Sequence, residues 1–323
     1  MPKKKILIVS SSQDTTAPFV EKSLTERGYR VVWYRTDLVA KGYVSANLYI
    51  DPTVDAQFVY NGENIDLCSI GAAWQRKPTV EIQFADKARG LSLTKEVRAL
   101  QDGIWDILPT SIWVNHPTDI RNGELKIPQL LLAKQIGFSV PQTILSNRWD
   151  VIKNRLSGDD VILKMARGLL YEDKSVKVLY TTPLSKQNLP EDSNPFPGIW
   201  QPFVKKKREW RVTVVGEKIF SVAVYSDDDA KDDWRKYDGT GHVTFKQEPF
   251  PLELERKCLL MLKKMNLRYG AFDFIEELDG KITFLEVNPS GQYLWLERLL
   301  GLPISEAVAD LLIAIADKKN TSP

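Results

Sequence analysis

The sequence predicts a mixed α/β protein made of more than one domain. Its first strand-like run, Lys5 to Val9, precedes a helical stretch from Ala17 to Arg27 and a second strand from Tyr29 to Tyr34. This order is typical of a parallel β-α-β unit. Further along, apolar runs on both sides of Gly216-Glu217 indicate an antiparallel hairpin. A length of 323 residues is enough for two or three domains.

Composition excludes several classes of protein. The chain is 43% hydrophobic and 27% charged, as ordinary globular proteins are. Its 44 basic and 42 acidic residues give a net charge of +2, which provides no strong field for nucleic acid. Cys68 and Cys258 form neither a disulfide framework nor a metal motif, which fits a reducing compartment. The first apolar run, Ile6 to Val9, is too short for a signal peptide or a membrane span. We therefore expect a cytoplasmic protein with no membrane or nucleic-acid partner.

The first unit continues to about residue 118, so we expect an N-terminal α/β domain over residues 1–118. Its further predicted strands and helix are Leu48–Ile50, Phe58–Tyr60, Gly71–Gln75 and Glu96–Ile107. Trp74, Arg76 and Lys77 lie at the end of one strand, where ligands often bind in open α/β sheets. A structural role for Arg76 is an equally good interpretation. The apolar residues Ile104 and Leu108 are assigned to the core, with a homodimer surface as the alternative.

A second unit, over residues 119–203, begins with a helix. Leu125 to Ile136 has helical periodicity, and Gly137 ends it as a C-cap residue. Three apolar runs of this unit are predicted strands: Val140–Leu145, Val161–Lys164 and Ile199–Val204. A polar segment, residues 168–196, interrupts the unit and contains one more predicted strand, Val176–Tyr180. This segment is either a docking site for a partner or a simple surface excursion.

The third predicted unit covers residues 204–323. It opens with a basic run, Lys205 to Arg208, which is interpreted as a solvated turn. Ser226 to Gln247 is polar and is predicted to be a long loop, a feature that is usually functional or mobile. The regular elements expected around that loop are the hairpin strands Val212–Val215 and Lys218–Val224 and the helices Leu252–Met265 and Ile304–Ala316.

A second hairpin carries the residues that point to chemistry. Its apolar strands flank an Asp-Gly turn at Asp279 and Gly280. Alternation across the strands brings Asp273 to the same face as Glu286 and Asn288. Three oxygen-bearing side chains on one face suit a magnesium ion, which usually also carries phosphate. Taken alone, a solvated hairpin with ordinary surface acids explains the pattern equally well.

The order of polar signals along the chain resembles the ATP-grasp superfamily of carboxylate-amine ligases. The hairpin that carries Asp273, Glu286 and Asn288 is preceded along the chain by other polar signals. In order, these are Lys126, Lys164, the segment Gln201–Val204, Glu209, Arg211 and Arg235. The resemblance covers roughly residues 115–312. It implies an ATP-grasp fold, with residues 1–118 as the pre-ATP-grasp domain, 119–203 as a small central lobe and 204–323 as the lobe that carries the metal site.

The resemblance also assigns roles to residues. Lys126 and Lys164 would contact the phosphates of ATP, and Glu209 would bind the ribose hydroxyls. Arg211 and Arg235 would face the phosphates or an acyl phosphate, for which the planar guanidinium is well suited. The adenine would be bound by the backbone of Gln201, Pro202, Phe203 and Val204. Magnesium, as two ions, would be held by Asp273, Glu286 and Asn288.

Three local motifs narrow the resemblance to the ligases that mature graspetides, the microviridin-type peptides. These motifs are GQYLWLE at Gly291–Glu297, DWR-Y at Asp233–Tyr237, and WVN-P followed by VPQT-L-SN at Trp113–Asn147. The implied activity is a macrocyclase: Asp or Glu side chains of a ribosomal precursor peptide are activated by ATP as acyl phosphates, and lactone or lactam rings close. Segment 168–196 is then the candidate dock for the peptide's leader. One departure is that Met165 to Asp173 contains only Gly168, where many ATP-grasp enzymes have a glycine-rich phosphate loop.

Several alternatives stay open at this level. His242 lies near the DWR motif and is either a general base or a solvated loop residue, whereas His116, before a proline, is assigned a structural role. A ligase that adds free amino acids to a carboxylate would use the same machinery. An ATP-binding regulator without turnover would keep the fold, although a complete metal set argues against a decayed site.

Overall fold

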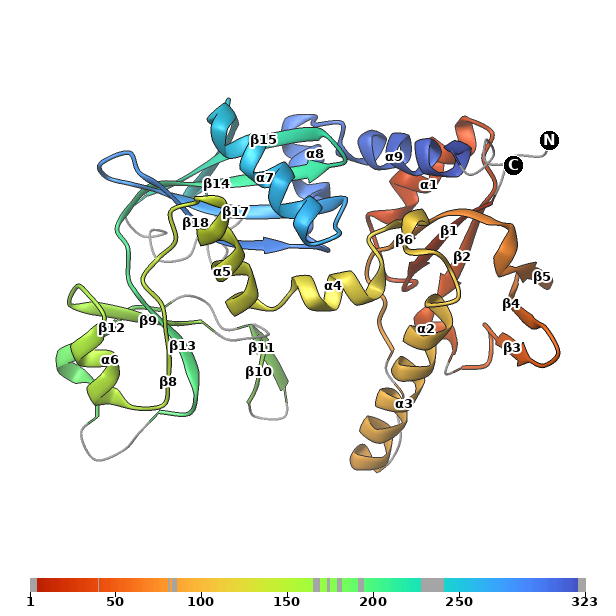
Figure 1. The fold of residues 1–323 in the computed structure, drawn as a ribbon, viewed down its shortest axis with the longest axis horizontal. Helices are drawn as coiled ribbons and strands as arrows, with labels where there is room; N and C mark the ends of the chain where they lie inside the picture. The colour runs from red at the N-terminus through yellow and green to blue at the C-terminus, as the bar shows by residue number, and fades with distance from the viewer. Residues whose placement is uncertain are drawn as a thin grey trace.

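The computed structural model describes residues 5–39, 41–80, 82, 86–164, 169–172, 175–178, 182–190, 195–227 and 241–318. It shows three parts, an N-terminal domain, a small lobe and a C-terminal lobe (Figure 1). The helix α4 (Pro117–Gly123) runs between the first and the last of these. No helix in the described ranges is long and apolar enough to span a membrane.

A four-stranded parallel sheet forms the centre of the N-terminal domain, as the β-α-β order predicted. Its strand order is β2-β1-β6-β7, with bounds Val31–Arg35, Lys5–Ser10, Ile70–Gln75 and Trp113–Val114. Ile6 to Val9 are fully buried, which explains their unbroken apolar run, because helices cover parallel sheets on both faces. The other elements are α1 (Ala17–Glu26), α2 (Thr36–Val39), α3 (Lys87–Trp105), the antiparallel strands β3 (Ala46–Ile50), β4 (Val54–Tyr60) and β5 (Glu63–Asp66), and the 3₁₀ turns Leu67–Ser69 and Thr110–Ile112.

The C-terminal helix completes this first domain. Helix α9 (Ile304–Lys318) lies beside α1 and β6 and shares one hydrophobic core with them (Figure 1). Arg27 forms ion pairs with Glu306 and Asp310, and the Tyr29 hydroxyl donates to Asp317 at 2.9 Å. The chain therefore returns to the domain in which it started, a closure that the local sequence patterns do not reveal.

The small lobe is a mixed assembly around its own minor core. Its antiparallel sheet has the order β12-β9-β13-β8, with bounds Leu184–Ser185, Asp160–Lys164, Gly198–Pro202 and Ile144–Ser146. Helix α6 (Trp149–Arg155) packs on it through Ile152 against Val161 and Trp200. Strands β10 (Leu169–Glu172) and β11 (Ser175–Val178) form a separate hairpin, and residues 186–188 form a 3₁₀ turn.

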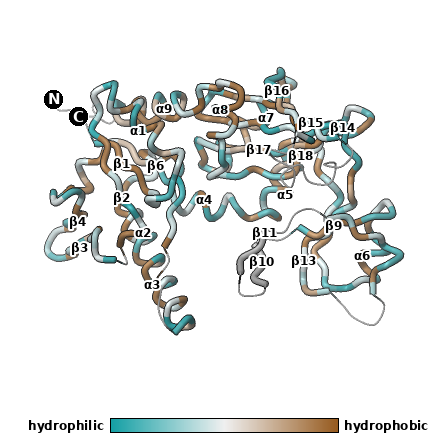
Figure 2. The backbone as a smooth tube through the Cα atoms, turned by 180° about the vertical axis from the view of Figure 1, so that it is seen from behind, coloured by the Kyte–Doolittle hydropathy of each residue, from teal (hydrophilic) through white to brown (hydrophobic). Residues whose placement is uncertain are grey.

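The C-terminal lobe is a five-stranded antiparallel sheet with helices on one face. The order is β16-β15-β14-β17-β18, with bounds Val243–Gln247, Lys218–Ser226, Lys206–Val215, Tyr269–Glu277 and Ile282–Asn288. Helices α5 (Lys126–Ile136) and α7 (Leu252–Lys264) pack against β18 and β17 and bury Phe272, Phe274 and Phe284. Short helix α8 (Leu294–Leu300) follows the sheet. Figure 2 shows apolar segments in strands of the N-terminal parallel sheet and of the C-terminal sheet.

Two expectations need correction here. The end of the predicted loop Ser226–Gln247 is strand β16, because Val243 to Gln247 pairs with β15 and Phe245 packs edge-on against Trp295 at 4.8 Å. Residues 228–240 of that loop lie outside the described residues. The basic run Lys205–Arg208 is no solvated turn, because β14 begins at Lys206 and the side chains of Lys206 and Arg208 are 10% and 17% exposed.

Candidate active site

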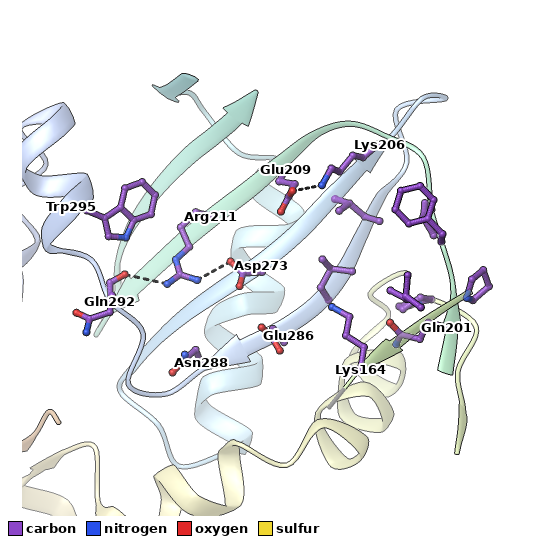
Figure 3. A pocket seen from close by; sticks show the side chains of 17 residues that line it. Lys164, Gln201, Lys206, Glu209, Arg211, Asp273, Glu286, Asn288, Gln292 and Trp295 are labelled. Carbon is purple, nitrogen blue, oxygen red and sulfur yellow. Dashed lines mark hydrogen bonds and ion pairs between the residues drawn. The ribbon is translucent and has the colours of Figure 1, made fainter. Parts of the chain in front are cut away.

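A cavity of about 280 Å³ opens between the small lobe and the free face of the C-terminal sheet (Figure 3). Strands β9 and β13 supply one wall, and β14, β17 and β18 supply the other. The sequence-predicted residues that line it are Lys164, Gln201, Pro202, Phe203, Val204, Glu209, Arg211, Asp273, Glu286 and Asn288. Polar residues from both lobes thus converge on one space, although they are up to 124 positions apart, from Lys164 to Asn288.

Strand register explains why three charged residues form one row. Arg211 on β14 lies opposite Asp273 on β17, which lies opposite Glu286 on β18. Cross-strand partners project from the same face of a sheet, so this row faces the cavity. Trp210 and Val212, which flank Arg211 in the sequence, are buried on the opposite, helix-covered face. The predicted placement of Asp273, Glu286 and Asn288 on a shared face agrees with this register.

A β-bulge in β18 adjusts the row. Asp273 pairs with Glu286 and Phe274 pairs with Phe284, so Leu285 has no partner on β17. Bulges are common beside active sites, because they break the alternation and turn a further side chain toward one face. Here both Leu285 and Glu286 line the cavity, while Phe284 stays fully buried on the other side.

Arg211 is a cation of the site whose side chain is only 12% exposed. Its Nη1 donates to Asp273 Oδ1 at 2.8 Å, and its Nη2 donates to the Gln292 carbonyl at 3.1 Å. Burial acts to lower the pKa of this guanidinium, but the charge of Asp273 and the hydrogen bond to it outweigh burial and raise the pKa. Arg211 is therefore a permanent positive charge held at a fixed position in the wall.

Two further ion pairs border the cavity. Lys126, at the first turn of α5, pairs with Glu286, although Lys126 is not itself a lining residue. Lys206 pairs with Glu209, and both side chains are nearly buried and line the cavity. Lys206 was not predicted as a site residue. A bulge in β14 leaves Lys207 between the paired residues Lys206 and Arg208, and this reverses the face on which Lys206 lies.

The segment that connects the two lobes, Gln201–Val204, has few polar side-chain contacts among the described residues. Gln201 is buried, and its Nε2 donates to Thr143 Oγ1 at 3.0 Å. The Phe203 backbone N–H donates to the Asp160 carbonyl at 2.9 Å, which attaches the segment to the edge of the small lobe. Ile162 and Leu285 add apolar surface to the same cavity. This end of the cavity is suited to a flat, largely apolar group.

Of the two other predicted catalytic residues, only His242 is described by the structure. Arg235 lies outside the described residues. His242 is 40% exposed, its Nδ1 lies 2.6 Å from Asp227 Oδ2, and it is not among the residues that line the cavity. Conversely, Gln292 and Trp295 line the cavity without having been assigned a role. The GQYLWLE motif was the signal that marked their position.

The loop after β18 is held by the N-terminal domain. Arg76, only 2% exposed, donates through Nη1 to the Ser290 carbonyl at 2.6 Å and through Nη2 to Gln292 Oε1. Its guanidinium also lies over the Tyr293 ring, 5.7 Å from the centroid. The sequence left Arg76 with a ligand-binding and a structural interpretation. The contacts that the structure shows are structural, because they lie within the protein and fix a loop of the cavity.

Asn115 provides a second connection to this loop. Its side-chain amide donates to the carbonyls of Tyr269 and Pro289 at 2.8 and 3.0 Å. Its Oδ1 accepts from the backbone N–H groups of Arg268 and Tyr269 at 2.7 and 3.1 Å. All the hydrogen-bonding capacity of a buried amide is thus satisfied, which fixes the start of β17 and the end of β18 relative to the first domain.

The donor set fits magnesium. Asp273 and Glu286 supply carboxylates, and Asn288 supplies an amide oxygen that already accepts from the Ser290 N–H at 2.9 Å and is thereby oriented. Within the described ranges, no three His, Cys, Asp or Glu side chains cluster as an all-protein metal site would require. Magnesium typically takes one or two carboxylates and completes its shell with phosphate and water. The residues present match that incomplete, phosphate-dependent kind of site.

Comparisons with known proteins agree with this geometry. Residues 5–121 match a family model described as the MvdD pre-ATP grasp domain. The chain is similar to macrocyclase MdnC from Microcystis aeruginosa MRC, solved with precursor peptide MdnA, with 27% identity, a TM-score of 0.83, and 96% of this chain and 99% of that chain covered. No curated protein shows significant sequence similarity to the chain.

Two more solved structures support the same assignment. A RiPP-associated ATP-grasp ligase of Chryseobacterium gregarium, in complex with ADP and a leader and core peptide, has 25% identity and a TM-score of 0.81, with 99% of this chain and 98% of that chain covered. Macrocyclase MdnB from Microcystis aeruginosa MRC has 26% identity and a TM-score of 0.78, with 96% and 99% covered. The fold class and the resemblance predicted from the sequence are thereby confirmed. The chain has the ATP-grasp fold with a pre-ATP-grasp domain, and it is similar to ATP-grasp ligases that include macrocyclases of the graspetide, or microviridin, type.

Proposed function

We propose that the protein closes side-chain rings in a ribosomal precursor peptide at the expense of ATP. A carboxylate oxygen of a peptide Asp or Glu attacks the γ-phosphorus of ATP, the bond to the β–γ bridging oxygen breaks, and ADP leaves. A Ser or Thr hydroxyl, or a Lys amine, of the same peptide then attacks the acyl carbon. It loses its proton, inorganic phosphate leaves, and a lactone or lactam remains.

One observation carries this proposal: the cavity brings a magnesium-type donor set and a nearly buried arginine into the same space. Phosphoryl transfer from ATP depends mainly on positioning and on shielding of oxygen charge. Asp273 and Glu286 provide carboxylate ligands for the metal, and Arg211 provides a planar fork of donors at a fixed position for phosphoryl oxygens. Similarity over nearly the full length to ligases solved with precursor peptides supports a peptide as the substrate.

The nucleotide is assigned to the space between the lobes. Lys164 and Lys126 are proposed for the phosphates, and Glu209 for the ribose hydroxyls. The backbone of Gln201, Pro202, Phe203 and Val204, beside apolar Ile162, is proposed for adenine. Lys126 and Glu209 are paired with Glu286 and Lys206, and these partners must exchange for the ligand.

Magnesium would neutralise the phosphate oxygens and so make the γ-phosphorus accessible to an anionic nucleophile. The chain's own residues hold it in place: Asp273 and Glu286 supply negative oxygens, and Asn288 adds a neutral one. Arg211 keeps Asp273 oriented and adds positive charge beside the reacting oxygens. Arg235 is proposed as its counterpart from the segment outside the described residues.

Mass spectrometry of candidate peptides tests the proposal. Short open reading frames beside this gene that encode a C-terminal stretch rich in Thr, Ser, Lys, Asp and Glu supply those peptides. With ATP and magnesium, we expect the loss of one water per ring and one ADP per water. A mass gain of one amino acid would instead favour the ligase that adds free amino acids, and nucleotide binding without ADP release would favour the regulator.

Two variants test whether this cavity is responsible. Arg211→Ala and Asp273→Ala should abolish peptide-dependent ADP release while the far-ultraviolet circular dichroism stays native. Unchanged turnover in either variant would show that this cavity is not the active site. Gln247→Glu, at an exposed position of β16, is a control for handling and expression.

The proposal has four finer parts. Segment 168–196, with the hairpin β10–β11, is the proposed dock for the peptide's leader. Two magnesium ions and a homodimer are proposed. The proposed location is cytoplasmic, in keeping with two cysteines, Cys68 and Cys258, that form no disulfide. Native mass spectrometry with ATP and magnesium would count both ions and protomers. Deletion of residues 169–178 should raise the KM for peptide and leave the KM for ATP unchanged.

A further inference from the structure

Gln292 has a side chain whose orientation is dictated by its neighbour. Arg76 donates to Gln292 Oε1, and a guanidinium carries donors but no acceptor. The amide must therefore present its oxygen to Arg76, and its NH₂ group must point the other way. Gln292 lines the cavity and is only partly buried. Within the part of the chain that the structure describes, the hydrogen bonds found for Gln292 use its Oε1 and its carbonyl, and none uses its Nε2.

The backbone of the same residue is fixed from the other side. The Gln292 carbonyl accepts from Arg211 Nη2 at 3.1 Å, and the Tyr269 hydroxyl donates to the Gly291 carbonyl at 2.6 Å. Gly291 itself tolerates no side chain, since a Cβ there would lie 2.4 Å from Ala271 Cβ. Gln292 is thus a rigid donor attached directly to the arginine of the site.

Position within the cavity indicates what this donor meets. Figure 3 shows Lys164 and Gln201 at one end of the cavity, Gln292 and Trp295 at the other, and Arg211 and Asp273 between them. If adenine occupies the Gln201 end, the γ-phosphorus lies toward Arg211. The space beside Gln292 is then where the group that attacks that phosphorus must enter.

We propose that the Gln292 side-chain amide donates a hydrogen bond to the peptide carboxyl group that becomes phosphorylated. Arg76 is the positioning residue that orients this amide from the N-terminal domain. The inference rests on the proposed function and names the contact that receives the acidic side chain. A neutral donor suits this task, because it orients the carboxylate while withdrawing less electron density from the attacking oxygen than an ammonium group would.

The alternative role for Gln292 is to anchor the loop only. Gln292→Glu separates the two roles, because Glu keeps an oxygen for Arg76 and replaces only the NH₂ group. An anchoring role predicts normal turnover and an equal or higher melting temperature, since the contact with Arg76 becomes charge-assisted. A donor role predicts that kcat for peptide-dependent ADP release falls by about 100-fold or more, the usual effect of losing one donor to a reacting oxygen.

Arg76→Lys completes the test. Lysine keeps the charge but presents a point charge instead of a planar fork. The side-chain amide of Gln292 can then rotate and exchange the positions of its oxygen and its NH₂ group. We expect kcat to fall roughly tenfold with the KM for ATP close to wild type. The melting temperature should fall slightly, because lysine gives up the fork that binds both Ser290 and Gln292. Gln247→Glu controls for the added negative charge and should behave as wild type.

The outcomes separate this inference from the function on which it rests. Wild-type kcat in Gln292→Glu, with wild-type enzyme converting its peptide, would overturn the donor role and leave the macrocyclase proposal intact. Peptides that never lose water with wild-type enzyme would contradict the proposed function itself. A fall in kcat in Gln292→Glu with an unchanged melting temperature supports the donor role.

Discussion

At the scale of single residues, the acids of the cavity are all held in ion pairs with basic residues of the same site. Asp273, Glu286 and Glu209 are the acids proposed to bind metal and ribose, and each is paired with Arg211, Lys126 or Lys206. Burying an unpaired carboxylate is costly, so these pairings stabilise the ligand-free pocket. Ligand binding must replace one partner of each pair, which favours the joint binding of ATP and magnesium over either alone.

Gly291 is the residue at which packing limits the site most tightly. In Gly291→Ala, the new Cβ would meet Ala271 Cβ at 2.4 Å and Arg211 Nη2 at 3.3 Å. We expect the free energy of unfolding to fall by about 2 kcal/mol and kcat to fall with it, because the loop must move away from Arg211. Urea denaturation and ADP release measure the two effects.

A second substitution in the same contact is the control. Ala271→Gly removes the atom with which the new methyl group collides, so the double variant should recover part of both losses. Additive losses in the double variant would show that the contact between residues 291 and 271 is not the cause.

At the scale of elements, two β-bulges shape the cavity, one in β18 at Leu285 and one in β14 at Lys207. The hairpin around Asp279-Gly280 could be predicted from its turn and alternation, and so could the shared face of Asp273 and Glu286. The bulges could not, because a two-residue period read from the sequence assumes an unbroken ladder. Lys206 was consequently interpreted as solvated, although the bulge turns it into the cavity.

Adjacent lysines test the bulge in β14. Lys206 lines the cavity, whereas Lys207 is 56% exposed and pairs with Glu276 on the outside. Lys206→Met should raise the KM for ATP by about tenfold through the loss of one positive charge beside the nucleotide. Lys207→Met should leave the KM unchanged. Equal effects of the two substitutions would mean that the register of β14 is not the one described.

The opposite face of β14 carries an ion network with a predictable pH dependence. Glu276 accepts from Arg208 at 2.6 Å, from Lys207 at 3.1 Å and from Trp210 at 3.1 Å. Burial acts to raise the pKa of Glu276, but these hydrogen bonds lower it below its usual value of 4.5. A lowered folded-state pKa adds stability above the unfolded-state pKa, and this stability is lost as the pH falls through the folded-state pKa.

Glu276→Gln should therefore destabilise the protein by about 3 kcal/mol at pH 7, because it leaves Arg208 buried with one carboxylate partner fewer. As the pH falls below about 4.5 and through the lowered folded-state pKa, the difference from wild type should shrink, since the wild-type carboxylate then also becomes protonated. Chemical denaturation at several pH values measures this. A difference that stays constant down to pH 3 would exclude the charge of Glu276 as its source.

At the scale of the whole molecule, the first domain and the C-terminal lobe are joined by a few buried polar contacts. Asn115 and Arg76 extend from β7 and β6 to the loop that carries Asn288 and Gln292. Neither contact could be predicted from local patterns, because the partners are 174 and 214 positions away in the sequence. The polar residues were visible in the sequence, but their partners were not.

Asn115 allows a test of this connection. Asn115→Ala leaves four buried backbone groups without a partner, so we expect the free energy of unfolding to fall by about 3 kcal/mol. We also expect a lower kcat, since the Pro289 carbonyl beside Asn288 is released. Asn47→Ala, at an exposed position of β3, should change stability by at most about 0.5 kcal/mol. A matching small change at Asn115 would contradict this account.

The return of α9 to the first domain has a consequence for synthesis. The apolar face formed by β1, β6 and α1 shares its core with Ile304, Val308 and Leu312. While the chain emerges from a ribosome, the first domain is translated first, yet its core stays incomplete until residues 304–318 have also emerged. Domains usually complete their folding in order from the N-terminus, and this fold departs from that order. The C-terminal lobe can assemble before the domain that precedes it, and a nascent chain exposes an uncovered apolar sheet for most of its translation.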